Sequence, residues 1–152
     1  MLERRRIEAK ILSHVYNELA AGHGKEVAAK IIADAVRASA IEQAREMADA
    51  VEGETTLQTF VDRQKLWTMG GALEFDVKEQ TSDTYAFHVT RCRYAEMYRD
   101  MGLGEIGHLL SCQRDGSFCE GYDERLKLTR NQTIMQGASH CDFTYRFEDK
   151  ND

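Results

Sequence analysis

The sequence contains no proline, and it has no long hydrophobic run. Because proline interrupts helices, its absence favours long unbroken ones. No apolar stretch approaches the ~20 residues that cross a bilayer. The N-terminus also lacks the apolar core of a signal peptide. We therefore expect a cytoplasmic protein that neither spans a membrane nor is secreted.

An excess of basic residues is also missing. The formal net charge is −6 and the isoelectric point is near 5.4. Binding to nucleic acid or to an anionic membrane surface needs a basic face, so the composition argues against both partners. The basic cluster Arg4, Arg5 and Arg6 is short, and we interpret it as the solvated start of a helix.

Cysteine is scarce in the first half of the chain. The four cysteines all lie in the second half, at Cys92, Cys112, Cys119 and Cys141. In a reducing cytosol they are expected to be thiols, nucleophiles or metal ligands rather than disulfides. No pair has zinc-finger spacing. The sequence identifies no cofactor with certainty, and it leaves a divalent metal, zinc or manganese, open as an alternative.

The first 71 residues have the periodicity of helices, and the 152-residue length suits a single domain, 1–152. We predict helices over 2–21 and 25–51, and a third that is capped by Thr55 or Thr56 and stopped by Gly70-Gly71. The apolar face expected for the first helix is Ile7, Ile11, Leu12, Val15, Tyr16 and Leu19. For the second helix it is Val27, Ile31, Ile32 and Ala35.

The period then changes to two, which is typical of strands. A hairpin is expected from strands 73–77 and 85–89, and further strands around 126–128 and 143–147. Short helices are predicted over 94–101 and 104–113, and a loop over 114–123. The predicted fold class is α+β: about three N-terminal helices packed on a four-stranded antiparallel sheet, with one or two short helices inserted between its hairpins. Residues 72–148 form the sheet part, which carries the candidate site.

Within the segment GHLLSCQRD, His108, Cys112 and Asp115 would share one face of a helix. A histidine beside a cysteine can lower the pKa of the thiol and make it more nucleophilic. Histidine and thiolate can also begin a zinc site. The alternative is that Cys112 is a small core residue and His108 a surface cap.

A second group, His140-Cys141-Asp142, begins the last predicted strand. Since neighbouring strand residues point to opposite faces, His140 and Asp142 could pair while Cys141 faces the core or a pocket.

Three arginines are further candidates. Arg91 and Arg93 flank Cys92 and would favour its thiolate, although arginines at a strand end are usually solvated. Arg130 could hold a substrate carboxylate bidentately, and an exposed ion pair is the competing interpretation.

The order of these features in the C-terminal half resembles the L-2-amino-thiazoline-4-carboxylic acid hydrolase family. That order is Cys92, Tyr94, a Gly-rich helical stretch, Cys112 with Asp115, Arg130 with Thr133, Gly137, and Cys141-Asp142-Phe143. Leu57, Phe60 and the Gly70-Gly71 stop are similar to its N-terminal part, so the resemblance covers residues 25–148. More distantly, the same half resembles the small-molecule-binding domain named after 4-vinyl reductases, in which a late cysteine follows a glycine turn.

The first resemblance implies hydrolysis of a small cyclic C–N compound, such as ring opening of L-2-amino-thiazoline-4-carboxylate to a carbamoyl cysteine. Cys112 would attack the C=N carbon, or His108 would activate a water molecule. Asp115 or Asp142 would orient the base or protonate the ring nitrogen, and Cys141 is a further catalytic candidate. Arg130, Tyr94 and Cys92 would bind the substrate.

Two other functions remain open from the sequence alone. The second resemblance implies a sensor-like domain that binds a small molecule without turnover. A metal- or redox-responsive interaction protein is the third interpretation, because Ala-rich helices with apolar stripes can pair with another copy as a homo-oligomer.

Overall fold

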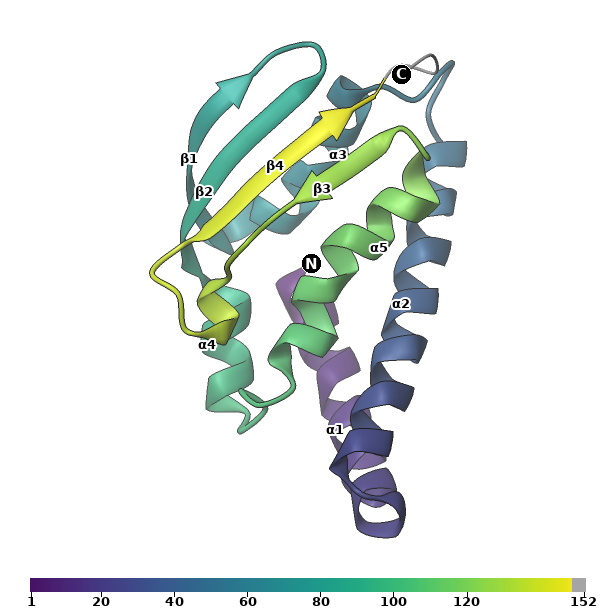
Figure 1. Ribbon diagram of the computed structural model, residues 1–152, viewed down its shortest axis with the longest axis vertical. Helices are drawn as coiled ribbons and strands as arrows, with labels where there is room; N and C mark the ends of the chain where they lie inside the picture. Colours follow the sequence, from purple (N-terminus) through teal and green to yellow (C-terminus); the bar gives the residue numbers. More distant parts are fainter. Residues whose placement is uncertain (149–152) are drawn as a thin grey trace.

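The computed structural model describes residues 1–148, so the last four residues of the predicted domain lie outside the description. The order of helices and strands confirms the α+β class (Figure 1). The helices are α1 (Leu2–His23), α2 (Lys25–Asp49), α3 (Leu57–Thr68), α4 (Arg93–Asp100) and α5 (Gln113–Tyr122). The strands are β1 (Leu73–Gln80), β2 (Thr84–Cys92), β3 (Leu126–Thr129) and β4 (Cys141–Phe147). Shorter turns are η1 (Met69–Gly71), the π-helical η2 (His108–Cys112) and η3 (Ile134–Gln136).

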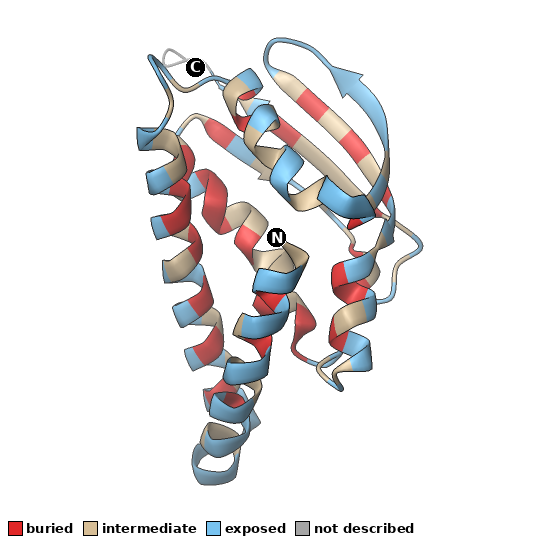
Figure 2. Cartoon of the chain, turned by 180° about the vertical axis from the view of Figure 1, so that it is seen from behind, coloured by how far each residue is buried: buried red, intermediate tan, exposed pale blue. Residues whose placement is uncertain are grey.

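The four strands form one antiparallel sheet in the order β1-β2-β4-β3. One face carries the buried side chains of the two central strands, Tyr85, Phe87, Val89, Cys141 and Tyr145. Helices α3 and α5 cover this face, since the Phe60 ring lies 4.6 Å from the Tyr145 ring and 6.1 Å from the Phe118 ring. Behind them, α1 and α2 form a helical hairpin whose inward faces are buried (Figure 2). No helix within residues 1–148 is long and apolar enough to cross a membrane.

The start of α3 confirms the predicted threonine cap. Thr56 is the N-cap: its hydroxyl accepts from the backbone N–H of Thr59, and the Thr59 hydroxyl oxygen accepts from the N–H of Thr56. This reciprocal pair satisfies two backbone donors that the first helical turn leaves free.

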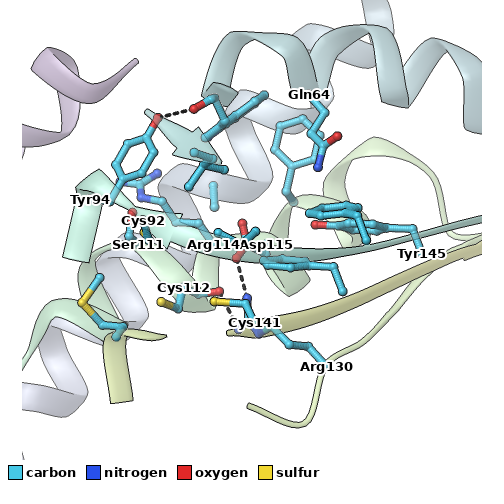
Figure 3. Close-up of a pocket in the computed structure, with 18 of the residues that line it drawn as sticks. Gln64, Cys92, Tyr94, Ser111, Cys112, Arg114, Asp115, Arg130, Cys141 and Tyr145 are labelled. Atoms are coloured by element: carbon cyan, nitrogen blue, oxygen red, sulfur yellow. Dashed lines mark hydrogen bonds and ion pairs between the residues drawn. The ribbon is translucent and has the colours of Figure 1, made fainter. Parts of the chain in front are cut away.

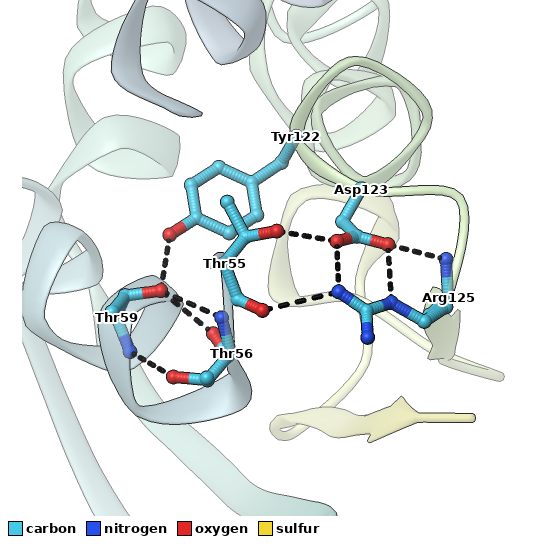
Figure 4. Close-up of polar contacts among 6 residues, drawn as sticks. All are labelled: Thr55, Thr56, Thr59, Tyr122, Asp123 and Arg125. Atoms are coloured by element: carbon cyan, nitrogen blue, oxygen red, sulfur yellow. Dashed lines mark hydrogen bonds and ion pairs between the residues drawn. The ribbon is translucent and has the colours of Figure 1, made fainter. Parts of the chain in front are cut away.

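A polar network ties the start of α3 to the turn between α5 and β3 (Figure 4). The Tyr122 hydroxyl donates to Thr59 Oγ1 at 2.7 Å, and the Thr55 hydroxyl donates to Asp123. Arg125 Nη2 donates to Asp123 Oδ2 at 2.8 Å and to the carbonyl of Thr55 at 3.2 Å. Burial acts to raise the pKa of Asp123, but the hydrogen bonds from Arg125 and Thr55 lower it to about 2. The network holds the start of α3 against the end of α5, and both helices cover the sheet.

The predicted apolar face of α1 is wrong in part. Its buried residues are Arg5, Ala9 and Tyr16, whereas Ile7, Ile11 and Val15 are 54%, 64% and 41% exposed. The helix therefore has two rows of side chains: an apolar row that faces solvent, and a row that faces the protein and includes the charged residue Arg5. Our prediction used hydrophobicity alone and so chose the row that faces solvent.

In helix α2 the buried row is displaced by one residue from most of the predicted apolar face. Ile32 is buried as predicted, but Val27 and Ile31 are 44% and 43% exposed and Ala35 is exposed. The buried row is Ala28, Ile32, Val36, Ala40 and Ala44. Small residues dominate this row because α5 packs directly against it.

The segment predicted as a loop over 114–123 is helix α5, and η2 leads directly into it. Its two glycines hid the helical pattern, but Gly121 has a packing role. A Cβ atom at Gly121 would lie 2.3 Å from the carbonyl oxygen of Ile41 and 2.9 Å from Ala44 Cβ. Glycine lets α5 approach α2 closely. Ile134 lies in η3, after the end of β3.

We expect Gly121→Ala to lower the free energy of unfolding by about 1–3 kcal/mol, because the added methyl group overpacks the contact between α5 and α2. Gly116→Ala in the same helix is the matched control, since nothing lies within 4 Å of its Cβ position. It should raise stability by about 0.5–1 kcal/mol, because glycine is a poor helix former. Urea unfolding measures both. Equal effects of the two substitutions would contradict the close approach of the helices.

Candidate functional site

A cavity of about 90 Å³ lies between the inner face of the sheet and the helices (Figure 3). Its volume suits several water molecules or one small organic molecule. Seven aromatic side chains form much of its wall: Phe60, Trp67, Phe87, Tyr94, Phe118, Phe143 and Tyr145. Among them, Trp67 meets Phe118 edge-on at 5.4 Å, and Phe87 stacks on Phe143 at 4.8 Å. The wall would suit a flat, largely apolar molecule.

An ion pair forms the polar part of this wall. Asp115, in the first turn of α5, accepts from Arg130 Nη1 at 2.5 Å. Arg130 follows β3, donates through Nη2 to the carbonyl of Cys112 at 3.0 Å, and lies over the Phe143 ring at 5.0 Å. The guanidinium of Arg130, which we predicted to hold a substrate carboxylate, is therefore already bound to Asp115 and to the carbonyl of Cys112.

The environment of Asp115 shifts the pKa of its carboxyl group. Burial raises the pKa of Asp115 above its usual value, and the charge and hydrogen bond of Arg130 oppose this rise. For Arg130, burial acts to lower the pKa, but Asp115 outweighs it and the net shift is upward. Although Asp115 is deep in the molecule, 29% of its side-chain surface is accessible, because it borders the cavity. A carboxyl group with a raised pKa is a suitable general base or acid.

Three of the four cysteines border the cavity: Cys92, Cys112 and Cys141. Cys92 Sγ accepts from the N–H of Ala95 at 3.4 Å, and Cys141 Sγ accepts from the N–H of Ile134 at 3.2 Å. Cys119 lies outside the cavity lining, and its thiol donates to the carbonyl of Asp115 at 3.3 Å. The sequence could not separate Cys119 from the others, because helix α5 was predicted as a loop.

The cavity thiols are not activated as we had expected. Burial first, and then the negative charge of Asp115, raises the pKa of Cys112. Burial raises the pKa of Cys92 to about 11 and also raises that of Cys141. All three shifts favour the neutral thiol over the thiolate at neutral pH.

The partners predicted to activate these thiols lie elsewhere. His108 begins η2 and does not border the cavity that residues 1–148 enclose. Arg91 pairs with Glu74 and Glu96, and Arg93 donates to the carbonyl of Gly70. Both arginines are thus exposed, which was the competing interpretation, and Arg91 forms ion pairs.

Asp142 and His140 do not form the predicted pair. Asp142 Oδ1 accepts from the backbone N–H groups of Asn131 and Gln132, at 2.9 Å each. Burial acts to raise the pKa of Asp142, but these hydrogen bonds lower it. The His140 ring contacts Gln132 and stacks on His88 at 4.5 Å. Because β4 alternates, Asp142 lies on the face opposite Cys141, as expected, and neither Asp142 nor His140 lines the cavity.

Tyr94 is the remaining predicted residue, and it borders the cavity. Its hydroxyl donates to the carbonyl of Trp67 at 2.9 Å. This contact joins α4 to α3 and orients the Tyr94 ring toward the cavity (Figure 3).

A polar group that sequence reasoning missed lies among the helices. Arg5 is only 2% exposed, so its assignment to a solvated cluster was wrong. Arg5 Nη1 donates to Glu8 Oε2 at 2.6 Å, and Nη2 donates to Gln43 Oε1 at 3.0 Å. Arg114 Nη2 donates to the same Glu8 oxygen at 3.3 Å. The spacing of Arg5 from Ala9 and Tyr16 was a signal that it shares their face.

The described residues also bear on a metal site. Within 1–148, no three histidine, cysteine, aspartate or glutamate side chains are arranged to hold a metal ion. The three cavity cysteines and Asp115 are brought to one cavity without forming such a set.

A profile of the family described as L-2-amino-thiazoline-4-carboxylic acid hydrolase matches residues 4–145. The chain therefore belongs to this family. No functionally curated protein matches the sequence.

Two of the solved structures that are similar to this chain show the shared fold. The phenol-responsive sensory domain of the transcription activator PoxR, solved with phenol, is 13% identical with a TM-score of 0.57, covering 90% of this chain and 72% of that one. Trafficking protein particle complex subunit 3 from Naegleria fowleri, covalently bound to palmitic acid, is 10% identical with a TM-score of 0.52, covering 94% and 96%.

The raised thiol pKa values predict slow alkylation. We expect Cys112 to react with iodoacetamide at pH 8 at least about tenfold more slowly in the folded protein than in urea, because the thiolate fraction falls tenfold for each unit of pKa. Peptide mass spectrometry over time measures the rate, and the urea-unfolded protein, in which all four thiols react, is the control. Equal rates in the two states would show that Cys112 is an accessible thiolate.

Proposed function

We propose that this member of the L-2-amino-thiazoline-4-carboxylic acid hydrolase family hydrolyses a small cyclic amidine, of the thiazoline type, that binds in the cavity. The observation that carries the proposal is the Asp115–Arg130 pair at the wall of an aromatic cavity. A carboxylate there can accept hydrogen bonds from an amidine, and the aromatic rings can contact its planar ring.

The chemistry assigned to Asp115 is general base catalysis. Asp115 takes a proton from water as the water oxygen bonds to the C=N carbon, and it then passes this proton to the ring nitrogen, which returns Asp115 to the carboxylate. The carbon then bears the new hydroxyl. When the carbonyl forms, the bond from this carbon to the ring sulfur breaks, and the hydroxyl proton passes through Asp115 to the sulfur. One water is consumed, and the product is a thiol that carries a carbamoyl group.

The other candidates take supporting parts in this proposal. Arg130 positions Asp115 through its 2.5 Å contact and opposes the rise in the pKa of this carboxyl group. Cys112 borders the reacting position as a neutral thiol rather than a nucleophile. His108 and Asp142, which we had considered as base or acid, lie off the cavity, so the base is assigned to Asp115.

A second candidate function is binding of a small molecule without turnover. It is supported by the fold shared with the PoxR sensory domain, whose structure contains phenol, and by the absence of an activated thiol from the cavity of residues 1–148. A ligand that raises the unfolding temperature without chemical change would favour this function.

Asp115→Asn should lower turnover of L-2-amino-thiazoline-4-carboxylate by about 100-fold or more, because general base catalysis contributes on this scale. Mass spectrometry would follow loss of the substrate and formation of the carbamoyl cysteine, with and without a chelator to test the open question of a divalent metal. Asp62→Asn is the matched control, since it removes an exposed carboxylate that pairs with Lys65. Full turnover by Asp115→Asn would reject Asp115 as the base, and no turnover by the wild type with added metals would favour the binding function.

Arg130→Gln should move the acid limb of the pH profile to higher pH. Arg130 opposes the upward shift in the pKa of Asp115, so its removal raises that pKa further, and a higher pH is needed to ionise the base. The pH dependence of kcat/KM measures this. If Arg130 only stabilised the fold, the acid limb of the kcat/KM profile, corrected for the folded fraction, would stay at the wild-type pH.

A further inference from the structure

Three buried donors at the cavity lack partners. Arg5 Nε, Gln43 Nε2 and Arg114 Nη1 are inaccessible to solvent and have no hydrogen-bond partner among residues 1–148. The three residues come from different helices, α1, α2 and α5, and each borders the cavity. They are 2%, 6% and 6% exposed. Since an unsatisfied buried donor is costly, three of them around one cavity indicate an acceptor group in the ligand.

The charges around these donors are also unbalanced. Glu8 Oε2 accepts from both Arg5 and Arg114, so one carboxylate serves two buried guanidinium groups. Burial, followed by the proximity of Arg5, lowers the pKa of Arg114 to about 10, while Glu8 acts in the opposite direction. An excess of positive charge in a buried place favours a bound anion.

The other arginine of the cavity does not offer such a place. Arg130 is already engaged by Asp115, by the carbonyl of Cys112 and by the Phe143 ring. Asp115 itself would repel an anion. The cavity therefore has an ion pair, Asp115 with Arg130, and a second polar group that keeps unpaired donors.

We propose that Arg5, Gln43 and Arg114 form an anion subsite that holds a carboxylate of the ligand, while Asp115 contacts the ligand's amidine end. The proposal rests on the proposed function only in sharing its cavity, and it requires no turnover. It makes the cavity selective for a molecule that carries one acidic group on a small planar ring. Gln43 is neutral and sets the selectivity, because its Oε1 accepts from Arg5 while its Nε2 is free to donate.

The test compares two aromatic probes that resist hydrolysis, 2-aminothiazole-4-carboxylate and 2-aminothiazole, which differ in the carboxylate alone. Isothermal titration gives the Kd of each. The wild type should bind the carboxylate probe at least about tenfold more tightly, as expected for hydrogen bonds to a charged group. Equal affinities, or no binding of the carboxylate probe, would overturn the anion subsite.

Gln43→Glu tests the residues of the subsite. The new carboxylate would pair with Arg5 and neutralise the subsite, so the variant should unfold at the wild-type temperature or above it. Its preference for the carboxylate probe should disappear, while its Kd for 2-aminothiazole stays within about twofold, because that probe does not reach the donors. Gln80→Glu makes the same change on an exposed strand position and should behave as the wild type.

A preference that survives in Gln43→Glu would overturn the assignment of these residues. The two proposals fail separately. Selective binding of the carboxylate probe by a protein that does not hydrolyse L-2-amino-thiazoline-4-carboxylate would support the subsite and reject the enzymatic function. Turnover of that substrate without any preference between the probes would do the reverse.

Discussion

The hydrogen-bonded ion pair between Asp115 and Arg130 is the interaction around which the cavity is organised. It joins the first turn of α5 to the segment after β3, and through Arg130 Nη2 it also holds the last residue of η2. Removing either partner would leave a charge uncompensated in a poorly solvated place, which is strongly destabilising. The pair therefore fixes the distance between α5 and the sheet, and the cavity lies in the space that remains.

The buried arginines on the helical side of the cavity also need partners of opposite charge. Glu8 compensates Arg5 and Arg114 only in part, and the residues with unpaired donors border a cavity whose wall is largely aromatic. Natural proteins retain such costly groups mainly where they serve binding or catalysis. In the proposed site, the aromatic wall would set the shape of the ligand, and the two polar groups at the cavity, Asp115 with Arg130 and Arg5 with Arg114, would set the orientation of the ligand.

The sequence predicted the fold class, the helical N-terminal part and the four strands, because their periodicities of about 3.6 and two are strong local signals. It failed where tertiary contacts override the local pattern. Gly116 and Gly121 made α5 resemble a loop, although Gly121 is present so that α5 can approach α2. Arg5 was assigned to the surface because charged residues usually lie there, and its spacing from Ala9 and Tyr16 and its contacts with Glu8 and Gln43 place it inside. Of the candidate site, Cys92, Tyr94, Cys112, Asp115, Arg130 and Cys141 meet at the cavity, whereas His108 and Asp142 do not.

A crystal structure of the Asp115→Asn variant with bound L-2-amino-thiazoline-4-carboxylate would test the central claim most directly. We predict that the substrate carboxylate lies within hydrogen-bond distance of Arg114 and Gln43. The C=N carbon should face residue 115, with the substrate ring against the aromatic side chains of the cavity. A substrate that binds outside the cavity, or that places its carboxylate on Arg130, would contradict this arrangement of the site.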